Sequence, residues 1–255
     1  MKNKRAQVTI FVIAGILIVA LVLMFFLLRP EKEPDPDSKP QENPGSFLQS
    51  CLKDSIREAV DEIGIKGGSK NPSISILSNF RGPITSVAYL CYQNEDFLSC
   101  VNQEPLLYKH LQEEIYDYIE EDVDACFNLM VQSFDKQGYT VTVRAGDFSV
   151  NIIPKKVLVN ISHEVTITKT GEVSREKDFE VILPSEFYEI TKAVQEIINR
   201  EATSVTCEFD IAGFQLLYHD FDIDKYSQAG TEIYYIEHKK THEKFRFAVR
   251  GCIYP

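Results

Sequence analysis

The strongest structural signal in this chain is residues 139–184, which read YTVTVRAGDFSVNIIPKKVLVNISHEVTITKTGEVSREKDFEVILP. Apolar side chains recur there at every second position, which is the spacing of β-strands that bury one face. We expect the chain to turn at Ala145-Gly146-Asp147 and to reverse at Thr170-Gly171. The inward-facing positions are Tyr139, Val141, Val143, Phe148, Val150, Ile152, Val157, Val159, Ile161, Val165, Ile167, Phe179, Val181 and Leu183. The stretch predicts an antiparallel β-meander.

Three amphipathic helices are predicted, two before the meander and one after it. They cover about 47–63, about 103–134 and a segment capped at Ser185, and a closing hairpin pairs 232–236 with 245–249. Gly67-Gly68 ends the first helix, and short irregular strands and turns separate it from the second. Helices and strands are segregated along the chain without regular βαβ alternation, so the predicted fold class is α+β.

Before these elements lies an apolar segment, Val8 to Leu28, with 21 consecutive residues that carry no charge. A helix of this length spans roughly 31 Å, which matches the hydrocarbon core of a bilayer. Basic residues precede the segment and acidic residues dominate 31–37, so we expect a cytoplasmic N-terminus and an exterior location for everything after Leu28. A cleaved secretory signal would have a shorter apolar stretch and a small-residue cleavage site. The sequence FLLRP at 26–30 offers no such site, so we expect the anchor to remain.

The predicted organisation has four parts. They are a cytoplasmic N-terminus (1–7), a single transmembrane helix (8–28), a Pro-rich linker (29–45) and a disulfide-stabilised extracytoplasmic domain (46–255). The five prolines of the linker cannot continue a helix, so it is predicted to be an extended spacer. The net charge of −11, from 38 acidic and 27 basic residues, would repel a polyanion and argues against nucleic acid as a partner.

The stretch KRAQVTIF at 4–11 resembles the class III, prepilin-type, signal of archaeal pilins and archaellins. In that family a membrane peptidase cuts between the small residue and Gln, which implies processing between Ala6 and Gln7. Pilins usually carry Glu five residues after the cut, where this chain has Phe11, and their helix continues outward as a rod, which the linker prolines prevent. The whole layout is similar to uncharacterised single-pass surface proteins of archaea, a resemblance that implies a tethered ectodomain and no known activity.

All six cysteines lie in the part assigned to the exterior, and an even number in an oxidising compartment indicates three disulfides. Six cysteines allow many pairings. Among them we expect Cys51 with Cys126, Cys91 with Cys100, and Cys207 with Cys252. The alternative is a metal site or a catalytic thiol. The chain has no Cys-x-x-Cys, and its closest pair has eight intervening residues, which disfavours that alternative.

Several polar patterns could carry chemistry. Asp220-x-Asp222-x-Asp224 resembles the opening of a calcium loop, but Lys225 and Thr231 replace the Gly and Glu that such a loop needs, so we expect a solvent-facing extended segment. His238 and His242 are four residues apart but flank a predicted turn, and we expect both to be exposed.

Other candidates also have ordinary structural explanations. His163 lies in the inward row of its strand and is expected to be a hydrogen-bonded core histidine. Acidic residues crowd the second helix opposite its apolar stripe, where a solvated face is expected rather than a catalytic carboxylate pair: Glu113, Glu114, Asp117, Glu120, Glu121, Asp122 and Asp124. Asn160 begins the only usable glycosylation sequon and is expected to point outward.

Two classes of function remain. The first is a non-enzymatic structural or interaction protein of the cell surface, either pilin-like or an accessory of a type IV pilus-like assembly, with one apolar patch or sheet edge exposed to protein partners. The second is a membrane-tethered extracellular hydrolase whose residues converge only in the folded chain. Because no catalytic, metal or cofactor motif is present, we expect no cofactor and favour the first class.

Overall fold

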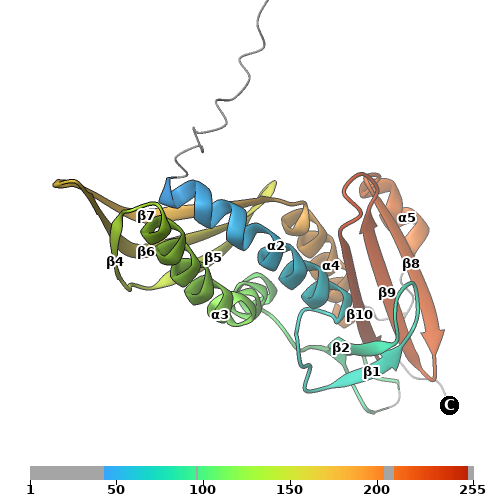
Figure 1. Ribbon diagram of the computed structural model, residues 1–255. Helices are drawn as coiled ribbons and strands as arrows, with labels where there is room; N and C mark the ends of the chain where they lie inside the picture. Colours follow the sequence, from blue (N-terminus) through green and yellow to red (C-terminus); the bar gives the residue numbers. More distant parts are fainter. Residues whose placement is uncertain (1–42, 96, 204–209, 252–255) are drawn as a thin grey trace, which may run out of the picture. The chain divides into compact units, whose positions relative to one another are not determined.

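A computed structural model describes residues 43–95, 97–203 and 210–251 (Figure 1). The chain divides between Glu42 and Asn43 into two units, and the elements below belong to the unit that begins at Asn43. The predicted segments 1–7 and 8–28, and the linker up to Glu42, lie outside the described residues. Within the described part of the chain, no helix is both long enough and apolar enough to cross a membrane.

The first two predicted helices are confirmed, with different ends. Helix α2 runs over Pro44–Ile65 and is capped by Asn43, whose Oδ1 accepts a hydrogen bond from the Ser46 amide at 2.7 Å. It therefore includes Pro44 and Gly45, which fall within the predicted linker 29–45. Helix α3 covers Leu107–Lys136 and begins later than predicted. Asn102 Oδ1 accepts a hydrogen bond from the Glu104 amide at 2.9 Å, and this turn holds the chain outside the helix.

The predicted meander forms a four-stranded antiparallel sheet of β4 (Thr140–Arg144), β5 (Phe148–Ile153), β6 (Lys156–Lys169) and β7 (Glu172–Pro184). The long strand β6 is central, with β7 on one edge and β4 and β5 one after the other on the opposite edge. The expected turn at 145–147 is therefore wrong. Residues 145–147 separate β4 from β5 along one edge of the sheet, and the chain runs in the same direction before and after them.

The interruption at 145–147 has a steric basis. The pairing of β6 with β7 shifts between Ile161 and Glu164, and the Ser162 amide donates to the Asp147 carbonyl at 2.9 Å. A Cβ on Gly146 would lie 2.3 Å from the Ser162 carbonyl oxygen, so only glycine fits here.

A second, mixed sheet has the order β1-β2-β10-β9-β8, with β3 also paired to β2. Its strands are β1 (Ser75–Ser78), β2 (Thr85–Tyr92), β3 (Val101–Asn102), β8 (Phe221–Gln228), β9 (Thr231–His238) and β10 (Lys244–Arg250). The predicted closing hairpin is confirmed, because β9 and β10 pair with Glu232 opposite Val249 and Ile236 opposite Phe245. Strand β2 runs parallel to β10, which no local pattern indicates.

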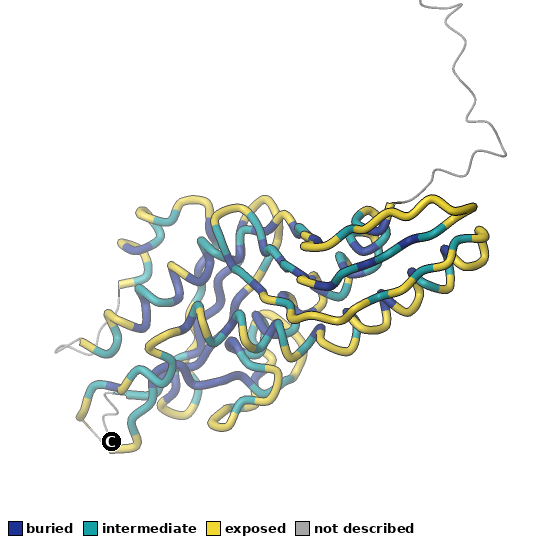
Figure 2. The backbone as a smooth tube through the Cα atoms, turned by 90° about the vertical axis from the view of Figure 1, so that its left-hand side faces the viewer, coloured by how far each residue is buried: buried dark blue, intermediate teal, exposed yellow. Residues whose placement is uncertain are grey.

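Helices cover the inner faces of both sheets. Helix α2 contacts β7 of the meander and β10 of the second sheet, α3 packs on β4 and β5, and α4 (Phe187–Thr203) packs against β10. Near the start of α4, Ser185 Oγ accepts a hydrogen bond from the Phe187 amide at 3.0 Å. Helix α5 (Ile211–Leu217) was not predicted. One apolar cluster joins these elements, and Figure 2 shows the buried residues on the inner sides of the helices and strands. The α+β class is confirmed.

Two disulfides connect described residues, and both are pairs that the sequence suggested. Cys51–Cys126 joins α2 to α3, and Cys91–Cys100 closes the loop between β2 and β3. The third expected pair, Cys207–Cys252, lies outside the described residues. Disulfides of this kind are typical of proteins that fold in an oxidising, extracellular environment.

A buried arginine and a half-buried glutamate lie in the second half of the unit. The fully buried Arg246 donates from its guanidinium to the carbonyls of Ile65, Phe80 and Pro83 at 3.2, 2.8 and 3.2 Å, and desolvation lowers its pKa. Arg246 thereby fixes the segment around residues 80–83 over the sheet. Glu201 in α4 accepts a hydrogen bond from the Tyr234 hydroxyl, yet burial raises the pKa of its carboxyl.

Candidate functional site

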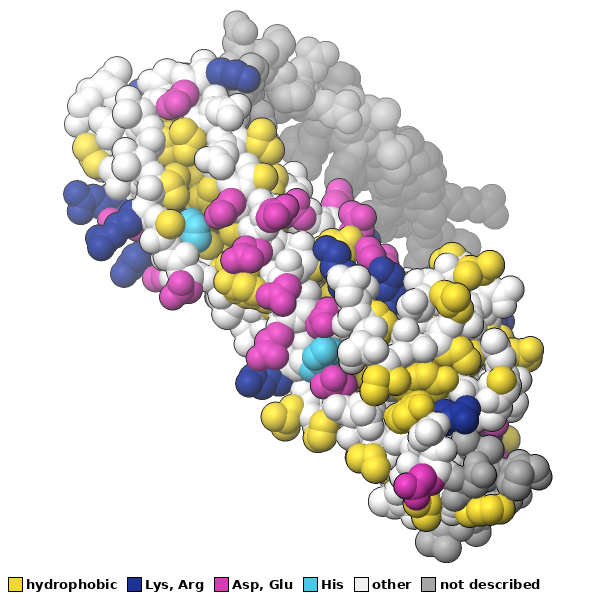
Figure 3. Space-filling view, turned by 90° about the horizontal axis from the view of Figure 1, so that it is seen from below, with side chains coloured by type: hydrophobic (Ala, Val, Ile, Leu, Met, Phe, Trp, Pro, Cys, Tyr) yellow, Lys and Arg dark blue, Asp and Glu magenta, His cyan; other side chains and the backbone are white. Residues whose placement is uncertain are grey.

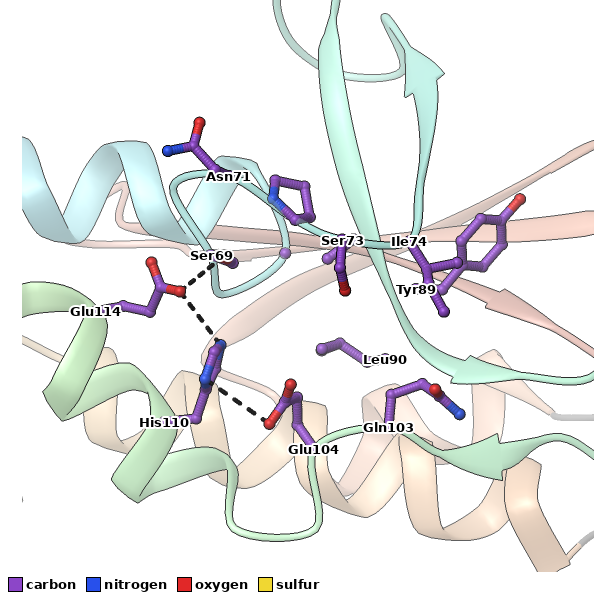
Figure 4. A pocket seen from close by; sticks show the side chains of 13 residues that line it. Ser69, Asn71, Ser73, Ile74, Tyr89, Leu90, Gln103, Glu104, His110 and Glu114 are labelled. Carbon is purple, nitrogen blue, oxygen red and sulfur yellow. Dashed lines mark hydrogen bonds and ion pairs between the residues drawn. The ribbon is translucent and has the colours of Figure 1, made fainter.

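A pocket of about 330 Å³ opens between the start of α3, the edge of β2 and the turn after α2 (Figure 4). Its lining residues come from segments up to 47 positions apart in the chain. They are Gly67, Ser69, Asn71, Pro72, Ser73, Ile74, Ala88, Tyr89, Leu90, Gln103, Glu104, His110 and Glu114.

The turn that ends α2 places Ser69 at this pocket. Gly67 has a φ of 86°, and a Cβ there would lie 2.9 Å from the Ala88 amide nitrogen. Only glycine allows the turn to approach β2 so closely, and the Ala88 amide donates to the Lys66 carbonyl at 2.8 Å. The two backbones are thereby held together, and the chain continues past Ser69 along the mouth of the pocket.

Glu114 connects this turn to α3. The Ser69 hydroxyl donates to Glu114 Oε1 at 2.7 Å, and the Lys70 amide donates to Glu114 Oε2 at 2.8 Å. His110 lies one helical turn earlier, with Nε2 3.9 Å from the Glu114 carboxylate and Nδ1 3.7 Å from Glu104 Oε2. In Figure 4 the imidazole stands between the two carboxylates.

The pocket is negatively charged. None of the 13 described residues that line it is Lys or Arg, whereas two are glutamates. Nearby cations are engaged elsewhere: Lys66 Nζ pairs with Glu62 at 2.6 Å, and Lys70 Nζ lies 4.5 Å from the centre of the Tyr118 ring. The hydrogen-bond donors that reach Glu114 are a hydroxyl and a backbone amide, which carry no charge, and His110 Nε2 lies 3.9 Å from its carboxylate.

Ser69 and His110 do not form a nucleophile–base pair in this pocket. In a Ser-His nucleophile the imidazole accepts the serine proton, but here the Ser69 hydroxyl donates directly to a carboxylate. The imidazole nitrogens of His110 lie 3.7 and 3.9 Å from the two carboxylates, beyond hydrogen-bond distance. Such a pocket presents several acceptors to a ligand that brings its own donors.

The aspartates at 220–224 do not form a calcium loop. Asp222 and Asp224 lie on strand β8 and point to the same side, where Arg81 Nη2 and Nε pair with them at 2.6 and 3.1 Å. The expectation of an extended segment is confirmed, although its carboxylates are paired with a guanidinium. Among residues 43–95, 97–203 and 210–251, no group of three His, Cys, Asp or Glu side chains could hold a metal ion.

The three histidines considered from the sequence lie apart from the pocket. His163 is buried as expected, stacks on Phe127 with ring centres 4.4 Å apart, and has its pKa lowered by desolvation. His242 is exposed. The expectation for His238 is wrong, because the turn after β9 folds back and Thr241 covers the imidazole, with its Oγ1 2.9 Å from His238 Nδ1.

The acidic residues of α3 lie largely on its solvent side, in a row that Figure 3 shows along the helix. Glu114 is the exception, because it turns into the pocket. Asn160 is half-buried on the outer face of β6, opposite Ser149 on β5 and Glu180 on β7. The processing residues Ala6 and Gln7 lie outside the described residues.

Sequence reasoning missed Glu104 and His110. The separation of four residues between His110 and Glu114 puts both on one side of a helix, and this was the only local signal available. Their approach to Ser69 and Ile74 depends on the packing of α2, α3 and β2.

Comparison with known proteins adds no further assignment. No protein family, curated protein or solved structure matches this chain.

Proposed function

We propose that this chain is a membrane-anchored, extracytoplasmic structural and interaction protein of the cell surface. The observation that carries the proposal is the pair of disulfides within a domain that follows a 21-residue uncharged segment in the sequence. Disulfides persist outside the cytoplasm, and an apolar segment of this length suits a single membrane span. Basic residues before the segment favour a cytoplasmic N-terminus and an exterior domain.

Exposed apolar side chains support a role in protein contacts. Ile74, Val101 and Leu106 have 42%, 59% and 69% of their surfaces exposed. Ile74 lines the pocket, and the other two lie within two residues of its lining residues Gln103 and Glu104. Exposed apolar side chains beside polar groups are typical of interaction surfaces.

The N-terminus suggests how such a protein is anchored. Cleavage between Ala6 and Gln7, as the resemblance to class III signals implies, would leave a chain that starts directly before the uncharged segment Val8 to Leu28. The chain would then be pilin-like or an accessory of a type IV pilus-like assembly in an archaeal envelope. Phe11 and the linker prolines favour a tethered domain over a filament shaft.

A membrane-tethered hydrolase is the second candidate, and the pocket with Glu104, His110 and Glu114 is the observation in its favour. It would require His110 to activate a water or hydroxyl nucleophile. We favour the interaction role because Ser69 is engaged by Glu114 and no described side chain in this pocket forms a nucleophile–base pair.

The proposal is tested with protease added to intact cells that express the full chain carrying a C-terminal epitope. We expect the epitope to be lost from intact cells and the membrane fraction to retain the chain after alkaline extraction. Mass spectrometry of the native N-terminus distinguishes a start at Gln7 from a start at Met1. An epitope that survives on intact cells and disappears only after lysis would refute the exterior location.

A further inference from the structure

We propose that the pocket between α3 and β2 binds a cationic side chain, Arg or Lys, presented by a protein partner. This inference rests on the proposed interaction role, since it specifies what the partner must carry. Three features support it: the charge of the pocket, the apolar residues in its lining and the character of the adjacent sheet edge.

Two carboxylates line the pocket, and its described lining contains no Lys or Arg to neutralise them. His110 is the basic side chain between them, with ring nitrogens 3.7 and 3.9 Å from the carboxylates. The side chains of Glu104 and Glu114 remain partly open to solvent, and Lys66 and Lys70 interact elsewhere. A guanidinium offers five donors in a planar fork, which suits carboxylate oxygens on two sides of one cavity.

The apolar lining suits the stem of such a side chain. Leu90 and Ile74 also line this pocket. In Figure 4 Leu90 lies beside Glu104, and Ile74 lies further along, next to Tyr89. Arg and Lys bury their methylene groups along apolar surfaces while their charged ends reach polar groups. Arg is also a frequent hot-spot residue at protein interfaces, where surrounding contacts exclude water from its pocket.

The neighbouring sheet edge favours a polypeptide over a small cation. Strand β1 ends the second sheet and carries no charge, and Ile74 immediately before it lines the pocket. The edge strands β7 and β8 instead carry several charged residues, which discourage the addition of another strand. Strand β5 is another edge strand without charge, but it belongs to the meander and does not line this pocket. Beside the pocket, an extended partner segment therefore meets the uncharged edge of β1.

The test measures binding of a fluorescein-labelled pentapeptide, GVRVG, to the full chain in detergent micelles by fluorescence anisotropy. A second peptide replaces Arg with citrulline, which keeps the shape and removes the charge. We expect saturable binding of the Arg peptide and at least about tenfold weaker binding of the citrulline peptide. Glu104→Gln should raise the Kd of the Arg peptide about tenfold.

Glu113→Gln is the matched control. Glu113 precedes Glu114 in α3, but it is exposed, pairs with Lys109 at 3.4 Å and lies outside the pocket lining. Because this variant removes the same charge from the same surface, it reports general attraction between an acidic protein and a cationic peptide. We expect its Kd to stay within about twofold of the wild-type value.

Three results would overturn the inference: no saturable binding of the Arg peptide up to millimolar concentration, equal binding of the citrulline peptide, or equal effects of Glu104→Gln and Glu113→Gln. The protease experiment on intact cells is independent of these results. A chain that is cleaved from outside but does not discriminate between the peptides retains its surface role and loses only the cationic partner.

Discussion

Removal of the Cys51–Cys126 disulfide should destabilise this chain more than removal of the Cys91–Cys100 disulfide. The two bridges join residues 75 and 9 positions apart. If a bridge acts by restricting the unfolded chain, the entropy of loop closure gives about 4.5 kcal/mol for the long loop and about 2.6 kcal/mol for the short one. The expected difference in the free energy of unfolding is therefore about 2 kcal/mol.

The assay is urea unfolding of the full chain, followed by far-UV circular dichroism, for the variants Cys51→Ala/Cys126→Ala and Cys91→Ala/Cys100→Ala. Alanine also removes buried sulfur, since Cys91 is fully buried. Both variants and the wild type are therefore measured again under reducing conditions, and the packing cost found there is subtracted. The loop-entropy reasoning would be refuted by one result. After the subtraction, the Cys91→Ala/Cys100→Ala variant would have lost as much free energy of unfolding as the Cys51→Ala/Cys126→Ala variant, or more.

Three other substitutions test the interior of the domain by the same unfolding assay. Arg246→Met leaves backbone carbonyls without their donor and should lower the free energy of unfolding by about 3 kcal/mol, whereas an unchanged midpoint would contradict this role. Glu201→Gln can still accept from Tyr234 and should stabilise the chain at about pH 7. Burial raises the pKa of the Glu201 carboxyl, so the wild type loses stability as the pH rises through the titration of this group. The extra stability of the Gln variant should therefore vanish near about pH 4. A stability gain that is independent of pH would exclude the buried charge as its cause. Gly146→Ala would place a methyl group against the Ser162 carbonyl and should cost about 2 kcal/mol, visible as a lower midpoint; wild-type stability would show that the interrupted sheet edge can move.

The regular elements could be predicted where one period persists over many residues. The apolar stripe of α3 and the alternation in β6 each repeat often enough to specify both the element and its buried face. The hairpin of β9 and β10 was predicted in the correct register, because its strands flank a short polar turn. Strand β2 was missed as a central strand, since it is buried on both faces and shows no alternation.

The candidate site could not be predicted in the same way. Glu114 was read as one of many acids on a solvated helix face, and this reading holds for its exposed neighbour Glu113. The two differ because only Glu114 faces the glycine turn after α2, where Ser69 donates to it. The spacing of residues in the sequence does not indicate that Glu114 and the turn after α2 lie close together. Likewise, nothing local indicates that Arg81 would pair with aspartates about 140 positions later in the chain.

The sequence alone determined the three long helices, the strands of the meander and the closing hairpin, the faces that they bury, the acidic character of the chain and the presence of an uncharged segment long enough for a bilayer. These properties follow from the side chains of consecutive residues and from their periodicity. Only the tertiary structure decided that β2 lies parallel to β10 and that Glu104, His110 and Glu114 meet Ser69 and Ile74 around one pocket. Contacts between distant segments depend on how whole surfaces pack, and packing is a property of the folded chain that neighbouring residues do not encode.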